Sequence, residues 1–143
     1  KTVLLPSQMA EDGSFPLELQ RTKPYGYALF NMDAMAIVAQ ILSTPEDNLW
    51  AFETTDGKSL RKGMEFIYPY IVDKNSWPYA KDIFIWEEWP VRQPCLLFAG
   101  IAYGMDEYID TYFRLPAHPT HPEVIRNLPV RNPVIWLMEK PLK

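Results

Sequence analysis

Four residues that can bind an anion or transfer a proton fall within one run of seven: Arg21, Lys23, Tyr25 and Tyr27. They combine fixed positive charge with phenolic hydroxyls. A cation can bind an acidic substrate, and a positioned phenol can accept or donate a proton. The run therefore predicts a site that binds an anionic substrate and moves one of its protons.

The run leads directly into the most apolar segment of the chain, which we predict to be a helix over residues 28–43. Apolar residues recur there at helical spacing and also occupy other faces, as shown by Leu29, Met32, Met35, Ala36, Ala39 and Leu42 together with Phe30, Ile37, Val38 and Ile41. A helix that is apolar on most sides is expected to be buried on most sides. Residues 11–27 are predicted to form an irregular loop, because Asp12 and Gly13 signal a turn and Pro16 disfavours a helix interior.

The rest of the chain also has helical periodicity. We predict helices over residues 59–72, 91–103, 106–115 and 123–128, with a last helix starting near Val130. Residues 73–90 form a long loop rich in aromatic residues, and long loops in compact domains are usually functional. No stretch predicts a pair of strands. The fold class is therefore all-α, built from short helices in hairpin succession.

One sequence run occurs twice, as PVRQP at residues 90–94 and PVRNP at residues 129–133. Two copies followed by apolar runs are compatible with a helical array, although such arrays usually have more repeats. For Arg92 and Arg131 we favour a structural interpretation, in which each forms a salt bridge near a helix start. Proline in the first turn favours helix initiation in both copies.

Composition narrows the class of protein. The chain has 143 residues, enough for one domain with a core, and a formal charge of −4 gives no support for a nucleic-acid partner. No apolar run approaches the ~20 residues that cross a bilayer, so no membrane partner is expected. The single cysteine, Cys95, lies in an apolar segment and is predicted to be a buried structural thiol. His118 and His121 alone make a poor metal site, and no metal is expected.

Several separated motifs resemble the alginate lyase superfamily of polysaccharide lyases. They are PLELQRTKPYGYALFNMDA at residues 16–34, DNLW at 47–50, TDGKSLRK at 55–62, FIYPY at 66–70 and WP at 77–78. The pieces occur in the family's order over about the first 100 residues. The later part is similar to the C-terminal end of bacterial members that act on alginate or glucuronan.

This resemblance implies an (α/α) toroid of antiparallel helix pairs around a groove. It also implies cleavage of a uronic-acid polysaccharide by β-elimination without a cofactor. An acidic polysaccharide is then the expected substrate, and a periplasmic or secreted location follows from family habit and substrate size. The family also uses an upstream histidine, commonly with an asparagine, yet no histidine precedes Arg21. We therefore expect residues 1–143 to be the C-terminal portion of one catalytic domain, with an upstream segment of the same enzyme as partner, and we allow for a homodimer.

The resemblance also assigns roles to residues. Arg21 matches the motif arginine, which neutralises the substrate carboxylate and so stabilises the enolate-like transition state. Tyr27 matches the catalytic tyrosine; a tyrosine can act as base and then acid if nearby positive charge lowers its pKa, which is normally ~10. Tyr25, two residues away, is the alternative candidate for this catalytic role. Glu18 is expected to orient Arg21 by a salt bridge, and Lys23 is expected to be a solvated charge.

Aromatic rings of the long loop are the remaining substrate-binding candidates. Trp77, Trp86 or Trp89 could stack on sugar rings, and packing in the core is an equal alternative for each. Two other functions remain open. One is a non-catalytic carbohydrate-binding helical module, and the other is a helical-repeat interaction protein.

Overall fold

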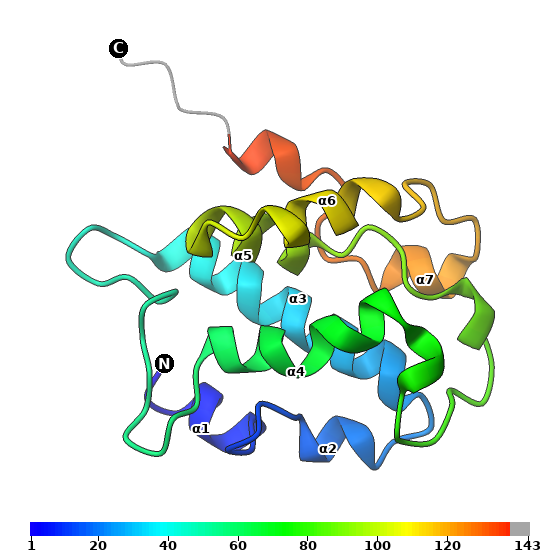
Figure 1. Ribbon diagram of the computed structural model, residues 1–143, viewed down its shortest axis with the longest axis horizontal. Helices are drawn as coiled ribbons and strands as arrows, with labels where there is room; N and C mark the ends of the chain where they lie inside the picture. The colour runs from blue at the N-terminus through cyan, green and yellow to red at the C-terminus, as the bar shows by residue number, and fades with distance from the viewer. Residues whose placement is uncertain (138–143) are drawn as a thin grey trace.

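A computed structural model describes residues 1–137, and helices form all of its regular elements (Figure 1). Its α-helices are α1 (Leu4–Gln8), α2 (Pro16–Leu19), α3 (Pro24–Leu42), α4 (Leu60–Val72), α5 (Pro94–Tyr103), α6 (Asp106–Arg114) and α7 (Pro122–Arg126). Three 3₁₀ turns complete the set, at Lys74–Ser76, Trp86–Glu88 and Pro133–Leu137. Among these residues there is no strand, only one isolated bridge between Glu53 and Ser59. The all-α prediction is confirmed.

Helix α3 is the central element and packs against α2, α4 and α5 (Figure 1). It starts at Pro24, four residues before the predicted start, and α2 starts at Pro16 inside the predicted loop. The loop prediction for residues 11–27 was therefore wrong in these two places. Both prolines stand in a first helical turn, where the missing N–H costs nothing and the fixed φ angle suits the helix. Tyr27 consequently lies within the first turn of α3 rather than before it.

Helix α3 is buried over much of its surface, as expected, but one face remains exposed. Phe30, Val38, Ile41 and Leu42 are 40%, 49%, 56% and 59% exposed. The opposite face, with Leu29 and others, is fully buried. An open, mainly apolar groove of about 250 Å³ lies between α1 and α3, and Val38 lines it. Both faces of α3 carry apolar residues, and helical periodicity does not show which of the two faces another element covers.

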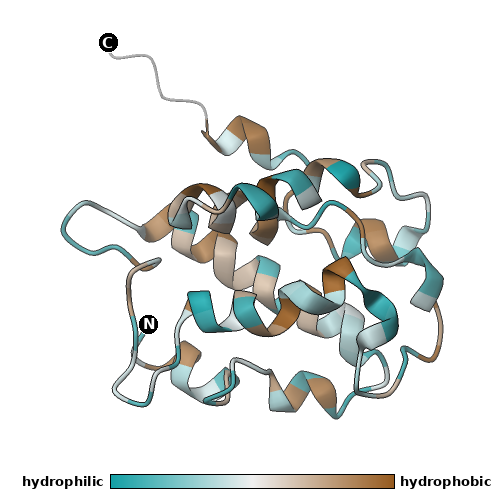
Figure 2. Ribbon diagram, in the orientation of Figure 1, coloured by the Kyte–Doolittle hydropathy of each residue, from teal (hydrophilic) through white to brown (hydrophobic). Residues whose placement is uncertain are grey.

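Helix α4 has the buried stripe that its sequence predicts. Leu60, Met64, Ile67 and Ile71 are buried, and the Ser59 side chain caps the helix by accepting a hydrogen bond from the Lys62 N–H. An amphipathic helix of this kind covers a core on one side only. Figure 2 shows the alternation of hydrophilic and hydrophobic residues along α4, in contrast to the mostly hydrophobic α5.

Helices α5 and α6 form a packed pair (Figure 1). Helix α5 starts at Pro94, three residues later than predicted, and Gly104 ends it with φ +65°, a left-handed conformation that glycine adopts readily. Arg92 donates hydrogen bonds to the carbonyl oxygens of Phe113 and Leu115, so it joins two chain segments. Among residues 1–137 it forms no ion pair of the kind that was predicted. The predicted last helix begins as the 3₁₀ turn Pro133–Leu137, and its continuation lies outside the described residues.

No helix within residues 1–137 combines the length and the apolar character that a membrane span requires.

Candidate functional site

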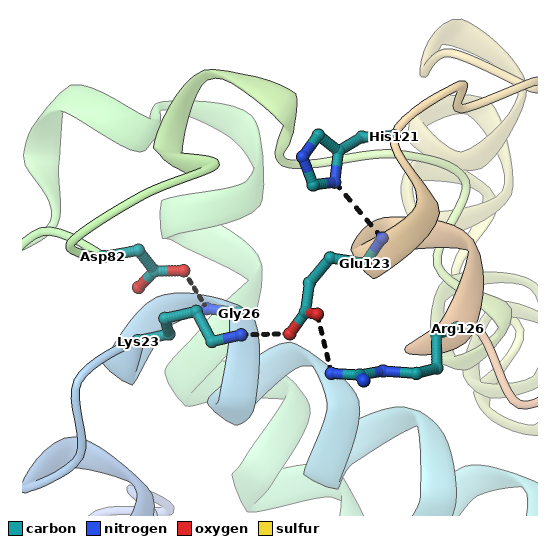
Figure 3. Close-up of polar contacts among 6 residues, drawn as sticks. All are labelled: Lys23, Gly26, Asp82, His121, Glu123 and Arg126. Atoms are coloured by element: carbon teal, nitrogen blue, oxygen red, sulfur yellow. Dashed lines mark hydrogen bonds and ion pairs between the residues drawn. The ribbon is translucent and has the colours of Figure 1, made fainter.

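The first turn of α3 is fixed by a carboxylate from a distant loop. Asp82 accepts hydrogen bonds from the N–H groups of Tyr25, at 2.9 Å, and Gly26, at 3.0 Å. These are two of the N–H groups that a helix start leaves without an intrahelical partner. Figure 3 shows Asp82 beside this turn. Asp82 thereby fixes the start of the helix that carries Tyr27.

Arg21 lies against the face of Tyr27. The guanidinium carbon is 3.7 Å from the centre of the Tyr27 ring, a cation–π distance. One guanidinium nitrogen also donates to Glu18, at 2.8 Å, which confirms the predicted salt bridge. The Arg21 side chain is nevertheless 51% exposed, so it remains accessible to an anionic ligand. Tyr27 itself is half-buried.

Lys23 corrects a sequence-based expectation. Its side chain is only 6% exposed and forms an ion pair with Glu123, 100 residues later in the chain, so the predicted solvated charge is wrong. The ammonium nitrogen lies 5.0 Å from the centre of the Tyr27 ring and 4.6 Å from that of Phe84. Only the packing of α7 beside the start of α3 brings Glu123 to this position.

Glu123 connects Lys23 to helix α7 (Figure 3). One carboxylate oxygen contacts Lys23, and the other accepts a hydrogen bond from Arg126 at 2.6 Å. The Glu123 N–H donates to Nδ1 of His121, which caps the helix. The hydrogen bond from Lys23, followed by the charges of Lys23 and Arg126, lowers the pKa of the Glu123 carboxyl. Glu123 therefore stays ionised beside Lys23.

Tyr25 belongs to the core. Its ring is fully buried, and its hydroxyl donates to the Tyr70 carbonyl oxygen at 2.9 Å. Burial, followed by the nearby Asp82 charge, raises the pKa of this phenol. Within residues 1–137 the Tyr27 hydroxyl has no such protein partner. Tyr25 thus presents no surface to a substrate, and the two tyrosines lie in different environments.

The tryptophans predicted to stack on sugars are core residues in this structure. Trp77 and Trp86 are 7% and 9% exposed, and their rings lie 5.1 Å and 5.3 Å from the Tyr25 ring. Trp89 is also buried. These rings pack in the core, which is the alternative that the sequence left open. We do not include them in the candidate site.

Phe84 is an aromatic residue beside the site that sequence reasoning did not single out. It is 49% exposed, and its ring contacts the Lys23 ammonium group. Its loop is held next to the site because the Ile83 N–H donates to the Thr22 carbonyl oxygen at 3.1 Å. The only sequence signal was its place in the long aromatic loop. An exposed ring held in this way offers a surface on which a sugar ring can stack.

The charged groups at the site balance one another. Arg21, Lys23 and Arg126 are cations, and Glu18, Glu123 and Asp82 are carboxylates. Arg21 lies beside Tyr27 and is half-exposed, so it can attract an acidic substrate even on a protein with a net negative charge. Within residues 1–137 no group of three His, Cys, Asp or Glu side chains could hold a metal ion.

Cys95 and Asp33 connect helices α5 and α3. Cys95 is buried, as predicted, and its N–H donates to Asp33 at 2.9 Å. Asp33 therefore caps α5 from within α3, as Asp82 caps α3 from the loop. Burial raises the pKa of the Asp33 carboxyl to about 7, against the opposing effect of the Cys95 hydrogen bond.

Comparisons with known proteins agree with this architecture. A sequence model of the family described as alginate lyase matches residues 1–77, which include Arg21 and Tyr27. A crystal structure of an alginate lyase from Bacteroides ovatus is similar, with a TM-score of 0.66 and 29% sequence identity. The similarity covers 80% of this chain and 30% of that chain, so this chain spans less than a third of that protein's length. No curated protein matches.

Proposed function

Because the chain belongs to the alginate lyase family, we propose that its protein is a polysaccharide lyase that cleaves a uronic-acid polysaccharide, alginate or glucuronan, by β-elimination. The observation that carries this proposal is the contact of the Arg21 guanidinium group with the Tyr27 ring at the start of α3, at 3.7 Å. That contact places a permanent cation beside a phenol whose hydroxyl is not engaged by a partner within residues 1–137.

The proposed chemistry follows from these two groups. The proton on C5 of a uronate becomes acidic enough to remove only when the adjacent carboxylate is neutralised. Arg21 neutralises that carboxylate, because a guanidinium group can bind both carboxylate oxygens at once. Tyr27 then takes the C5 proton as base and returns a proton to the departing O4 as acid. The C4–O4 bond breaks and a C4–C5 double bond forms, so no water and no external redox partner enters the reaction.

Residues 1–143 supply one part of the proposed catalytic domain. The similarity to the Bacteroides ovatus structure covers 30% of that chain, which leaves room for groups contributed by other segments. We propose that the remaining groups, a histidine and an asparagine, come from a segment outside residues 1–143. His118 is exposed and His121 caps α7, and neither is given this role.

The test is a direct assay of the full-length protein with alginate, glucuronan and a neutral polysaccharide as control. The proposal expects ultraviolet absorbance of unsaturated uronate ends to increase with time on a polyuronate only. Absence of that product on every polyuronate would reject it.

A second candidate function is non-catalytic binding of acidic polysaccharide. The observation that favours it is the half-exposed Arg21 guanidinium group, which can bind a carboxylate whether or not a bond is broken. Binding of alginate in affinity electrophoresis without any unsaturated product would support this alternative over the enzyme.

The proposed substrate also sets the proposed location. A polysaccharide of this size is met outside the cytoplasm, so we propose a periplasmic or secreted protein. Cell fractionation with an antibody against the protein tests this location, and a cytoplasmic signal would contradict it.

A further inference from the structure

Lys23 is a buried cation whose partner lies far along the chain. Its side chain is 6% exposed, and Glu123 contacts its ammonium group from α7. An ammonium group loses most of its hydration when it is buried in this way and needs a charged partner in return. The Lys23–Glu123 ion pair, shown in Figure 3, therefore determines where the lysine's positive charge lies.

That charge lies beside the proposed catalytic tyrosine. The Lys23 nitrogen is 5.0 Å from the centre of the Tyr27 ring, and the Phe84 ring covers it from the loop at 4.6 Å. Other charged groups lie near Lys23 and Tyr27. Asp82 approaches from the loop, and Arg126 contacts Glu123 on α7. Arg21, which is paired with Glu18, lies on the Tyr27 ring.

We propose that Glu123 is a positioning residue for the lyase reaction, which holds the Lys23 ammonium group against Tyr27 and balances its charge. This inference rests on the proposed function, since it concerns the same tyrosine. Glu123 touches neither substrate nor the reacting atoms in this proposal. It acts through Lys23, and helix α7 thereby controls the electrostatic environment of a residue about 100 positions earlier in the chain.

The proposal predicts opposite shifts of the pH profile for substitutions of Glu123 and of Lys23. In Glu123→Gln the Lys23 charge remains but is no longer balanced, so the site becomes more positive and the phenolate form of the base is favoured. In Lys23→Met the site becomes more negative and the phenolate is disfavoured. The ascending limb of the kcat/KM profile against pH should therefore move to lower pH in the first variant and to higher pH in the second. Each shift should be about 0.5 to 1 pH unit, the size expected for one charge at a partly buried site.

The experiment measures pH profiles on a polyuronate for the full-length wild type, Glu123→Gln, Lys23→Met and the double variant. The double variant should return the limb close to its wild-type position, because both charges are gone. Glu65→Gln is the matched control, since Glu65 forms an exposed ion pair with Lys62 within α4. Its profile should match the wild type. The proposal is overturned if the ascending limb of the kcat/KM profile does not move in the single variants. It is also overturned if the limb moves in the same direction in both.

Stability measurements keep the test independent of activity. Glu123→Gln leaves the Lys23 ammonium group without its partner, and Lys23→Met leaves Glu123 paired with Arg126 alone, so each should lower the urea midpoint by more than the double variant does. In the extreme form of this result, a single variant fails to fold whereas the double variant folds. A double variant less stable than both single variants overturns the inference. If the wild type cleaves no polyuronate, the proposed function fails, and the urea midpoints still show whether Glu123 holds Lys23.

Discussion

An Oδ atom of Asp82 lies 3.0 Å from the backbone nitrogen of Gly26, although 56 positions separate the two residues in the chain. The contact is possible because Gly26 has no side chain. A Cβ atom at this position would lie 2.8 Å from that oxygen and 2.9 Å from the Trp89 indole nitrogen. The start of the helix that carries Tyr27 is thus fixed by a loop residue, and a glycine makes the approach possible.

Replacing Gly26 by alanine should destabilise the protein. The added methyl group collides with Asp82 and displaces the cap of α3, and overpacking of this kind costs about 1–3 kcal/mol. Urea unfolding measures the loss. In an Asp82→Ala background the same substitution should cost clearly less, since the cap is already gone. Equal costs in both backgrounds would show that the cap is not the cause.

Tyr27→Phe should reduce kcat on a polyuronate by about 10²-fold or more, because it removes the proposed base and acid while leaving the ring under Arg21. Tyr25→Phe is the matched comparison. It loses the hydrogen bond to the Tyr70 carbonyl oxygen, so its stability should fall by about 1 kcal/mol while its kcat stays near the wild-type value. The reverse pattern of activity loss would assign the catalytic role to Tyr25.

Arg21→Lys should lower kcat/KM on polyuronates by about 10-fold or more. Lysine keeps the charge but cannot bind a carboxylate through two parallel hydrogen bonds or stack its charge flat on a ring. Arg61→Lys is the control, because Arg61 stacks on the Tyr103 ring at 4.0 Å in the same way but lies in α4. Steady-state kinetics should find this control unchanged, and an equal loss in both variants would point to a general effect on the fold.

Phe84→Ala should raise KM for oligouronates several-fold with little change in kcat, because it removes the exposed ring next to Lys23. Phe84→Tyr, which keeps the ring, should behave like the wild type. Phe113→Ala controls for the loss of an exposed ring, since Phe113 is 52% exposed and also lies near a cation, Arg92. If KM is unchanged in Phe84→Ala, Phe84 does not belong to the substrate-binding surface.

The buried Asp33 carboxyl should make the free energy of unfolding fall as pH rises. Burial raises its pKa from 3.8 to about 7 in the folded protein, so the folded state holds a proton that the unfolded state has lost between these values. The stability contributed by this group is fully present below about pH 4 and is lost as pH rises to about 7, by up to ~1.4 kcal/mol per pH unit.

Asp33→Asn tests this dependence, because asparagine keeps an acceptor for the Cys95 N–H and cannot titrate. The free energy of unfolding of the wild type minus that of the variant should fall from pH 5 to pH 7 and stay level above that. A difference that is constant across this range would contradict the raised pKa.

The sequence by itself determined the helical character of the chain and its family. The apolar stripe of α4 and the glycine that ends α5 are local features, because helical periodicity and a left-handed glycine involve neighbours within a few residues. The Glu18–Arg21 pair was predictable for the same reason, since the two residues are three positions apart. The motif around Arg21 and Tyr27 also identified the family that the comparison later showed.

Only the tertiary structure decided which of these side chains can meet a substrate. Tyr25 and Tyr27 are two positions apart and chemically identical, yet packing buries the first and leaves the second beside Arg21. Lys23 looked like a solvated charge until α7 placed Glu123 against it. Burial and charge pairing depend on which distant segments pack together, and in this protein those segments are separated by about 50 to 100 residues, far beyond the range of any local pattern.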